Sequence, residues 1–359
     1  MIDTLQQAKS FIQKYNTHQP VNIMEVCGTH TMAISRHGLR QLLPPNINLI
    51  SGPGCPVCVT SAYDIDWILE IIKNHELKLF SFGDMIRVPG TESSLLEQKS
   101  QGKDITICYS PTDALNYAVK NPHKKVLFVA IGFETTTPLS SVVIKRAAEY
   151  DLNNFFIFST HKLVPPALKL LVEDKQLNIN GFLCPGHVSA IIGSEPYNFI
   201  PENYGIPCVI SGFEPADIMI SIAMILRQLK FNQPETQIQY KSVVKPEGNL
   251  VAVKNIYDVF LKADSRWRGL GPIAGSGLEL KPDYNRFDAK LNFPVKDIMP
   301  KQNPACDCGN VLKGLKKPPE CKLFAKLCTP QNPVGPCMVS SEGSCAAYYR
   351  YERFNLERT

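Results

Sequence analysis

The chain has 359 residues, a formal net charge of +5 and a hydrophobic content of 44%, which together are typical of a globular protein of two or three domains. Its basic residues are scattered apart from short runs such as 313–317, so the charge pattern excludes an obvious nucleic-acid-binding surface. A chain of this length builds its own core, so its 12 cysteines do not indicate the disulfide framework of a small secreted protein.

Residues 1–20 predict one helix, over 4–15, which we expect to pack on the carboxyl-terminal part of the chain. They contain no continuous apolar run of the kind found in a secretory signal. The longest strongly apolar run, 218–226, is too short to span a bilayer. We therefore expect a cytoplasmic protein with no membrane partner and no nucleic-acid partner. In that reducing compartment, clustered cysteines indicate metal-binding or catalytic sites.

Between about residues 20 and 231, short β-branched and aromatic runs alternate with amphipathic helical patterns, which is typical of βα units around parallel sheets. The helical patterns fall at 63–73, 113–119, 139–150, 166–173 and 216–229. The predicted strands are eight, at 21–26, 47–50, 77–82, 105–109, 126–131, 154–159, 181–183 and 207–210.

Eight strands predict two sheets, and a short internal echo indicates two related halves. The sequence VAIGFETTTP at 129–138 is echoed by VISGFEP at 209–215. We therefore predict an α/β fold with two similar Rossmann-like domains, 21–122 and 123–232, facing a cleft. After about residue 232 the alternation fades, so 233–359 is expected to form a third, mostly helical or irregular domain.

Nearly every predicted strand is followed by a residue that can carry chemistry. Because ligands bind beyond the carboxyl ends of strands in open parallel sheets, two facing sheets would direct these side chains into one cleft. The residues concerned are Cys27, Cys55, Cys58, Asp84, Glu134, His161, His187 and Glu214.

The first of these positions lies in Cys27-Gly-Thr-His30, where the imidazole could polarise the thiol or donate to a ligand that the thiol holds. The alternative is a packed core thiol with His30 at a helix start. The second lies in Gly52-Pro-Gly-Cys-Pro-Val-Cys58, where a predicted helix start favours thiolate. Cys55 and Cys58 fit either a thioredoxin-like dithiol or a two-thiolate metal clamp, as against inert buried cysteines.

Four acidic or imidazole side chains end later strands. Glu134 and Glu214 each follow Gly-Phe and open a helix, where the helix dipole stabilises a carboxylate whether or not it has another role. His161 and His187 occupy positions useful to a proton donor, and each could equally be a hydrogen-bonded structural histidine.

Six cysteines lie in the tail, between residues 306 and 345, in a stretch without histidine. Their spacing contains no CxxC knuckle, so it fits an iron-sulfur cluster held by four cysteines better than structural zinc, although ligand type alone leaves zinc open. Four ligands would leave two of the six cysteines unused, and two free thiols beside a cluster are suited to an electron relay or disulfide switch. The six are Cys306, Cys308, Cys321, Cys328, Cys337 and Cys345.

Over essentially its full length the chain resembles the HypD family of nickel-iron hydrogenase maturation factors. The resemblance implies two similar α/β domains with a cluster-bearing third domain, and a scaffold that acts with the small chaperone HypC. On it an iron ion acquires one carbonyl and two cyanide ligands, with HypE as cyanide donor, before transfer to the hydrogenase large subunit. The motifs that carry the resemblance are Cys27-Gly-Thr-His30, Gly52-Pro-Gly-Cys-Pro-Val-Cys58, Gly132-Phe-Glu-Thr-Thr136, Cys184-Pro-Gly-His-Val188, Gly275-Ser-Gly-Leu-Glu279 and the stretch 337–349.

The resemblance also implies roles for individual cysteines. Cys27 corresponds to the iron-binding thiol, and Cys55 with Cys58 to a neighbouring redox-active or metal-binding pair. The ligands of a 4Fe-4S cluster would be Cys306, Cys321, Cys328 and Cys345. Electrons would pass between cluster and cleft through Cys308 and Cys337.

Beside these cysteines we expect His30, Glu134 and His187 to hold cyanide nitrogens or pass protons. The protein would then be a redox-active assembly scaffold rather than a conventional turnover enzyme. Two rivals stay open from the residues alone. One is an iron-sulfur thiol-disulfide oxidoreductase that uses Cys55 and Cys58, and the other is a zinc-stabilised binding module.

Overall fold

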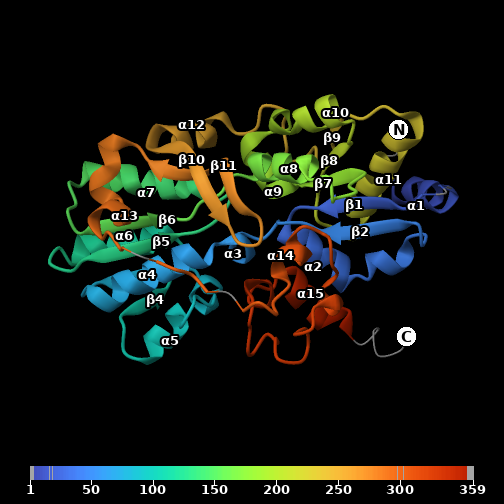
Figure 1. Cartoon of the computed structure of the whole chain (residues 1–359). Coiled ribbons are helices and arrows are strands. Elements are labelled where there is room, and N and C mark those ends of the chain that lie inside the picture. The colour runs from blue at the N-terminus through green and yellow to red at the C-terminus, as the bar shows by residue number, and fades with distance from the viewer. Residues whose placement is uncertain (1–3, 16, 18, 297, 302, 354–359) are drawn as a thin grey trace.

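The computed structural model describes residues 4–15, 17, 19–296, 298–301 and 303–353. It contains two parallel sheets, which confirms the predicted α/β class (Figure 1). One sheet has the order β2 (Ile47–Ser51), β1 (Val21–Glu25), β7 (Gly181–Pro185), β8 (Cys208–Ser211) and β9 (Thr236–Ile238). The other has the order β4 (Ile105–Ile107), β3 (Lys78–Ser81), β5 (Val126–Ala130) and β6 (Phe155–Ser159).

The helices begin with local signals that the sequence carries. For example, Ser61 Oγ accepts a hydrogen bond from Asp64 N at 3.1 Å at the start of one helix, and Ser110 with Pro111 begins another. The α-helices are α1 (Leu5–Lys14), α2 (Gly28–Arg36), α3 (Pro56–Val59), α4 (Ala62–Asn74), α5 (Leu95–Ser100), α6 (Pro111–Lys120), α7 (Thr137–Glu149), α8 (Val164–Glu173), α9 (Gly186–Ile192), α10 (Phe199–Tyr204), α11 (Pro215–Phe231), α12 (Leu250–Val259), α13 (Ala289–Asn292), α14 (Cys308–Leu312) and α15 (Ser344–Tyr351).

The sheets are interleaved along the chain. Strand β1 pairs with β7 in the register Ile23↔Gly181, so the five-stranded sheet combines segments 21–51 and 181–238 around an inserted four-stranded sheet. This arrangement differs from the predicted division into 21–122 and 123–232, because residue 122 falls between β4 and β5 of one sheet. Periodicity locates strands but carries no information on which strands pair.

Both faces of each sheet are covered, which explains the continuous apolar runs of the strands. In β5, Leu127 and Val129 join the core beneath α4, whereas Phe128 joins the core beneath α6 and α7. The helix α1 packs on α11 through Ala8 and Ile12, rather than on the tail as we expected. Both helices contribute to one apolar core, in which Ile222 and Leu226 of α11 are fully buried.

An antiparallel hairpin, which the fading pattern after residue 232 did not predict, lies between the two sheets (Figure 1). Its strands are β10 (Phe260–Trp267) and β11 (Gly271–Leu280). Buried Trp267 stacks on Phe133 with ring centroids 5.9 Å apart, and Leu163 N donates to Ser276 O at 2.8 Å. The hairpin thus holds the loops after β5 and β6 in place.

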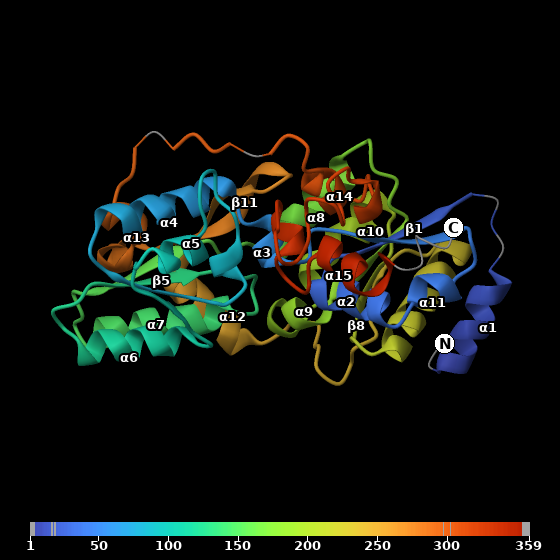
Figure 2. The ribbon, with the colours of Figure 1, turned by 90° about the horizontal axis from the view of Figure 1, so that it is seen from below.

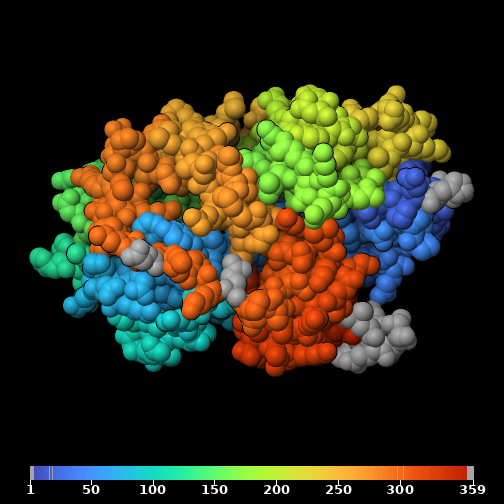
Figure 3. Space-filling model, viewed as in Figure 1, coloured from blue at the N-terminus to red at the C-terminus, as the bar shows by residue number. Residues whose placement is uncertain are grey.

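The cysteine-rich tail, residues 303–353, packs against α2 and α3 at the junction of the two sheets (Figures 2 and 3). It contains only short helices, as its sequence predicted, with α14 and α15 at its two ends. Within the described residues, no helix combines the length and apolarity needed to cross a membrane.

Candidate metal and thiol centre

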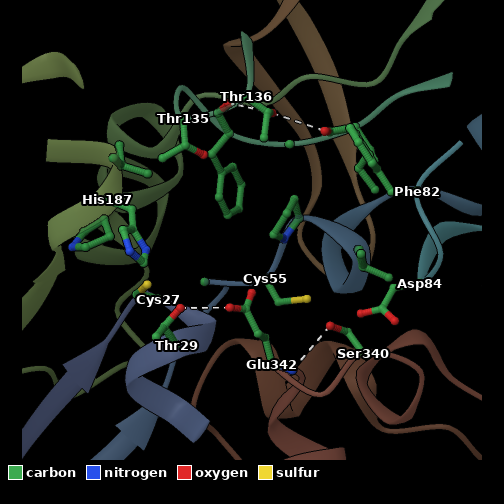
Figure 4. Close-up of a pocket in the computed structure, with 18 of the residues that line it drawn as sticks. Cys27, Thr29, Cys55, Phe82, Asp84, Thr135, Thr136, His187, Ser340 and Glu342 are labelled. Carbon is green, nitrogen blue, oxygen red and sulfur yellow. Dashed lines mark hydrogen bonds between the residues drawn. The ribbon is translucent and has the colours of Figure 1, made fainter. Parts of the chain in front are cut away.

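A cleft of ≈ 730 Å³ opens where loops from both sheets meet the tail (Figure 4). Its walls come from the loops that follow β1, β2, β3, β5 and β7, and from tail residues 340–342. Among the strand-end residues singled out from the sequence, those that line the cleft are Cys27, Cys55, Asp84 and His187. Residues that follow the carboxyl ends of strands in both sheets therefore meet at one cavity, as expected for parallel sheets.

The two amino-terminal cysteine loops are in direct contact. Gly28 N donates to Gly54 O at 3.0 Å, and a Cβ atom at Gly54 would lie 2.2 Å from Cys27 N. Only glycine allows the backbones to approach so closely. The contact places Cys27 and Cys55 on one wall of the cleft, with the Cys27 sulfur beside the His187 ring (Figure 4).

We expect Gly54→Ala to lower the free energy of unfolding by about 3 kcal/mol, because the new methyl group collides with backbone atoms that cannot rotate away. Urea unfolding monitored by circular dichroism would measure the change. Gly83→Ala is the matched control, since Gly83 also lines the cleft but its added Cβ would meet only Ile107 Cγ2 at 3.7 Å. Equal stability of the two variants would contradict this account of the loop contact.

Cys27 is buried just before α2, and burial raises the pKa of its thiol to about 12, with the Glu342 carboxylate adding to the rise. The helix amino terminus acts in the opposite direction, but loss of hydration outweighs it. The thiol therefore stays protonated at neutral pH, and a soft metal that binds here must displace the proton. Cys27 is suited to hold a metal ion rather than to act as a free nucleophile.

Two acidic residues beside Cys27 were not assigned to the site from the sequence. Glu342 Oε1 accepts a hydrogen bond from Thr29 Oγ1 at 2.8 Å and lines the cleft (Figure 4). Glu25 lies buried behind the cysteine, where its Oε2 accepts from Cys27 N at 3.3 Å, and burial raises its pKa to about 7. The sequence did carry signals for both residues, because Glu25 is an acidic residue in an apolar strand and Glu342 belongs to the motif at 337–349.

The two histidines expected near Cys27 both pack on Phe213, with ring centroids 4.9 Å (His30) and 4.0 Å (His187) from it. His30 is buried, its Nε2 donates to Gly212 O at 2.9 Å, and burial lowers its pKa to about 4. It does not line the cleft. His187 is exposed there, so it is the imidazole placed to meet a ligand.

Glu134 lies behind the cleft wall rather than on it. Its Oε1 accepts from Val164 N at 3.0 Å at the start of α8, and its Oε2 has no partner among the described residues. Burial raises the pKa of this carboxyl to about 7. The observed contacts give Glu134 a helix-capping role.

We expect Glu134→Gln to change how stability depends on pH. The folded pKa of Glu134, about 7, exceeds the ordinary value of 4.5, so the wild type gains stability from the protonated carboxyl at low pH and loses it as the pH rises from 4.5 through about 7. Glutamine cannot ionise. The stability of the variant relative to wild type should therefore rise by about 2 kcal/mol between pH 5 and pH 8. Chemical denaturation at both pH values measures this, and parallel profiles would contradict it.

Cys55 and Cys58 connect the cleft to the tail. Cys58 N donates to Cys55 Sγ at 3.3 Å at the start of α3. Cys55 faces the cleft, whereas the Sγ of fully buried Cys58 donates to Pro336 O of the tail at 3.9 Å, and the neighbouring Cys337 thiol helps to raise the pKa of Cys58. The pair thus forms a bridge between two sulfur-containing regions.

Within the tail, the sulfurs converge although their spacing in sequence is irregular. Cys306 Sγ and Cys308 Sγ are 3.3 Å apart. Hydrogen bonds from Cys308, Cys345 and Cys58 lower the pKa of the Cys337 thiol. A small cavity, also bounded by Phe324 and Met338, is lined by Cys306, Cys308, Cys321, Cys328 and Cys345.

This donor set fits an iron-sulfur cluster. The cavity presents five thiols and otherwise apolar walls, and soft thiolates in an apolar shell are the ligands such clusters take. Among the described residues, no three His, Cys, Asp or Glu side chains are grouped to hold a single metal ion. A 4Fe-4S cluster takes four cysteines for four irons, so its ligand sulfurs surround the cluster rather than one ion.

The comparisons agree with these features. Residues 3–352 match the family model described as HypD, hydrogenase formation hypA family. The chain is 45% identical over 358 residues to the hydrogenase maturation factor HypD of Escherichia coli. The alignment covers 99% of this chain and 96% of that protein. It is 45% identical over 338 residues to HypD of Rhodobacter capsulatus, covering 93% of this chain and 90% of that protein. The chain therefore belongs to the HypD family of hydrogenase maturation factors.

Proposed function

We propose that this maturation factor is a redox-active scaffold for assembly of the iron group with two cyanide ligands and one carbonyl ligand. Iron is the substrate, held by Cys27 in the cleft and shared with a small chaperone of the HypC type. A donor of the HypE type delivers cyanide, and the chaperone passes the product to the hydrogenase large subunit. Support comes from the family membership and from a buried thiol at a cleft of ≈ 730 Å³.

The tail would hold a 4Fe-4S cluster through Cys306, Cys321, Cys328 and Cys345, and the cluster would store and pass single electrons. Four of the five cysteines that line the small cavity are those four. The fifth, Cys308, lies close enough to Cys345 and Cys337 to shift the pKa of both thiols, and Cys58 Sγ donates to Pro336 O, next to Cys337, at 3.9 Å. This continuity is consistent with a relay through Cys308 and Cys337.

Transfer of cyanide from a thiocyanate carrier requires two electrons. In the proposed step the carrier's S–C bond breaks, the carrier leaves as a thiol, and cyanide is released to iron. Cys55 and Cys58 lose two electrons and two protons as they form a disulfide; the electrons cleave the S–C bond, one proton goes to the carrier thiol, and the other goes to solvent as the cyanide anion binds iron. The relay then returns the pair to the dithiol form with electrons from the cluster.

One observation carries this proposal: fully buried Cys58 reaches the tail, where its Sγ donates to Pro336 O, next to Cys337, at 3.9 Å. It joins the thiols of the cleft region to the tail, which is far away in the sequence. A stand-alone thiol-disulfide oxidoreductase would use Cys55 and Cys58 in the same way, but it assigns no role to Cys27 on the same cleft wall. The contact of the two loops favours the scaffold.

Anaerobic purification tests the proposal, first through the metal content. We expect a brown protein with four irons and four sulfides in the tail, whereas a colourless protein with zinc would support the binding module. Cys328→Ser should lower the cluster content by more than half, and Cys108→Ser, whose residue lies outside both cavities, should leave it unchanged. Infrared spectra of the complex with the small chaperone should then show cyanide and carbonyl bands. Their absence from the intact complex would support the oxidoreductase instead.

A further inference from the structure

A loop of the tail, residues 321–328, lies between the small sulfur-lined cavity and solvent. Its buried side chains line the cavity, and these are Cys321, Leu323, Phe324 and Cys328. Its other side chains are exposed on the surface of the tail, and these are Lys322, Ala325, Lys326 and Leu327. One layer of chain therefore separates the proposed cluster ligands from solvent.

The backbone of this loop forms a tight turn. Cys328 N donates to Leu323 O at 2.9 Å, and Ala325 N donates to Cys328 O at 3.2 Å. Ala325 has a φ of 56°, in the left-handed region that residues other than glycine rarely adopt. Strained backbone of this kind is concentrated at functional sites. The turn holds the side chains that follow it, Lys326 and Leu327, in a fixed arrangement.

The surface around the loop carries an excess of positive charge. Between residues 303 and 328 the chain has five lysines but only two acidic residues. Lys313 pairs with Asp174 at 3.4 Å, and Lys316 pairs with Asp307 at 2.9 Å. Among the described residues of this stretch, those without a salt bridge are the lysines Lys317, Lys322 and Lys326 and the acid Glu320, all exposed.

An apolar side chain lies among these lysines. Leu327 is 66% exposed and directly precedes Cys328, a proposed cluster ligand. An apolar contact with a charged rim is the usual composition of a protein interface. The tail residues that line the cleft are 340–342, so the loop lies outside the cleft. A protein could therefore contact the loop without entering the cleft.

We propose that Lys317, Lys322, Lys326 and Leu327 form a docking face for a small acidic protein that carries single electrons, and that this partner reduces the tail cluster. The inference rests on the proposed function, which gives the tail a 4Fe-4S cluster but no source of electrons. In each encounter the carrier loses one electron and the cluster gains it, without making or breaking a bond. Two encounters supply the two electrons that one cyanide transfer consumes.

The charge and size of the face select this class of partner. Positive potential speeds the encounter with an acidic protein and orients it, so that electrons enter where the cysteines lie closest to solvent. Complexes of electron carriers are short-lived and bury less than about 1,200 Å². A face with one exposed leucine and a few lysines fits such an encounter, whereas a permanent partner would need a larger apolar surface.

Binding and reduction by a 2Fe-2S ferredoxin of net negative charge test the proposal on the anaerobically purified full chain. Calorimetry with oxidised ferredoxin gives the dissociation constant without electron transfer, and stopped-flow absorbance with reduced ferredoxin gives the rate of cluster reduction. At an ionic strength of about 0.01 M, Lys322→Glu/Lys326→Glu should weaken binding and slow reduction about 100-fold. The difference from wild type should largely disappear at about 1 M, where charges are screened.

The matched control is Lys120→Glu/Lys124→Glu, which makes the same change of charge at exposed lysines. These lie at and just after the end of α6, a helix that Figures 1 and 2 both place far from the tail. The control should keep wild-type values. Iron content and bleaching by dithionite verify that each variant holds an intact cluster. Lys322→Gln/Lys326→Gln is the milder variant if charge reversal disturbs the cluster.

The outcomes separate this inference from the proposed function. Wild-type binding and reduction in a cluster-bearing tail variant overturn the docking face, and so does an equal loss in the control. A cluster-bearing wild-type chain that the ferredoxin neither binds nor reduces overturns it as well. In these three cases the proposed function is untouched. A wild-type chain without iron in the tail contradicts the proposed function and the docking face together.

Discussion

Cys27→Ala is expected to abolish the cyanide and carbonyl infrared bands of the complex with the small chaperone, while the tail cluster and the fold are retained. Cys27 is the iron ligand of the proposed function, and it lies on the cleft wall beside His187 (Figure 4). Loss of a direct metal ligand should weaken iron binding by more than about 100-fold, since even indirect neighbours of a ligand contribute 10–100-fold. Infrared spectroscopy and iron analysis of the purified complex measure the two parts of this result.

The matched control is Cys108→Ala, which removes another buried thiol that lies at the end of the four-stranded sheet, outside the cleft. Its complex should keep both sets of bands. Bands of normal intensity in the Cys27→Ala complex would rule out Cys27 as the holder of iron, whatever the state of the cluster.

Cys337→Ala is expected to disconnect the tail from the cleft. The thiols of Cys308, Cys345 and Cys58 lie close enough to Cys337 to lower its pKa. Without its sulfur, electrons from a reduced cluster should reach the Cys55–Cys58 disulfide at least about 100-fold more slowly. Rapid acid quench after anaerobic reduction of the cluster, followed by alkylation, measures the rate at which that disulfide is lost.

Cys208→Ala is the control for packing, because Cys208 and Cys337 are both fully buried but Cys208 lies in the five-stranded sheet. In the Cys208→Ala variant, the Cys55–Cys58 disulfide should be reduced at the wild-type rate. A wild-type rate in Cys337→Ala would mean that electrons reach the cleft by another route, and the relay would have to be abandoned.

Strands were predicted well from the sequence, but their pairing was not. All eight predicted strands occur, because buried parallel strands carry dense β-branched and aromatic runs. The hairpin 260–280 was missed since its strands alternate less regularly, as in the segment FLKADSRW of β10. Interleaving of the two sheets depends on contacts between distant segments such as Ile23 and Gly181, which no local pattern encodes.

Several motif residues lie at the candidate site, whereas the residues that support it could be found only in the structure. Cys27, Cys55 and His187 meet at one cleft because they follow strands of one sheet. Glu342 could not be placed there from the sequence, since its contact with Thr29 spans most of the chain.

The most direct test of the account is anomalous diffraction at the iron absorption edge, from anaerobic crystals of the chain loaded with iron in complex with the small chaperone. The account predicts one iron bonded to Cys27 Sγ in the cleft and a four-iron peak enclosed by Cys306, Cys321, Cys328 and Cys345. Iron bound away from Cys27, or tail sulfurs paired as disulfides with no iron between them, would contradict it.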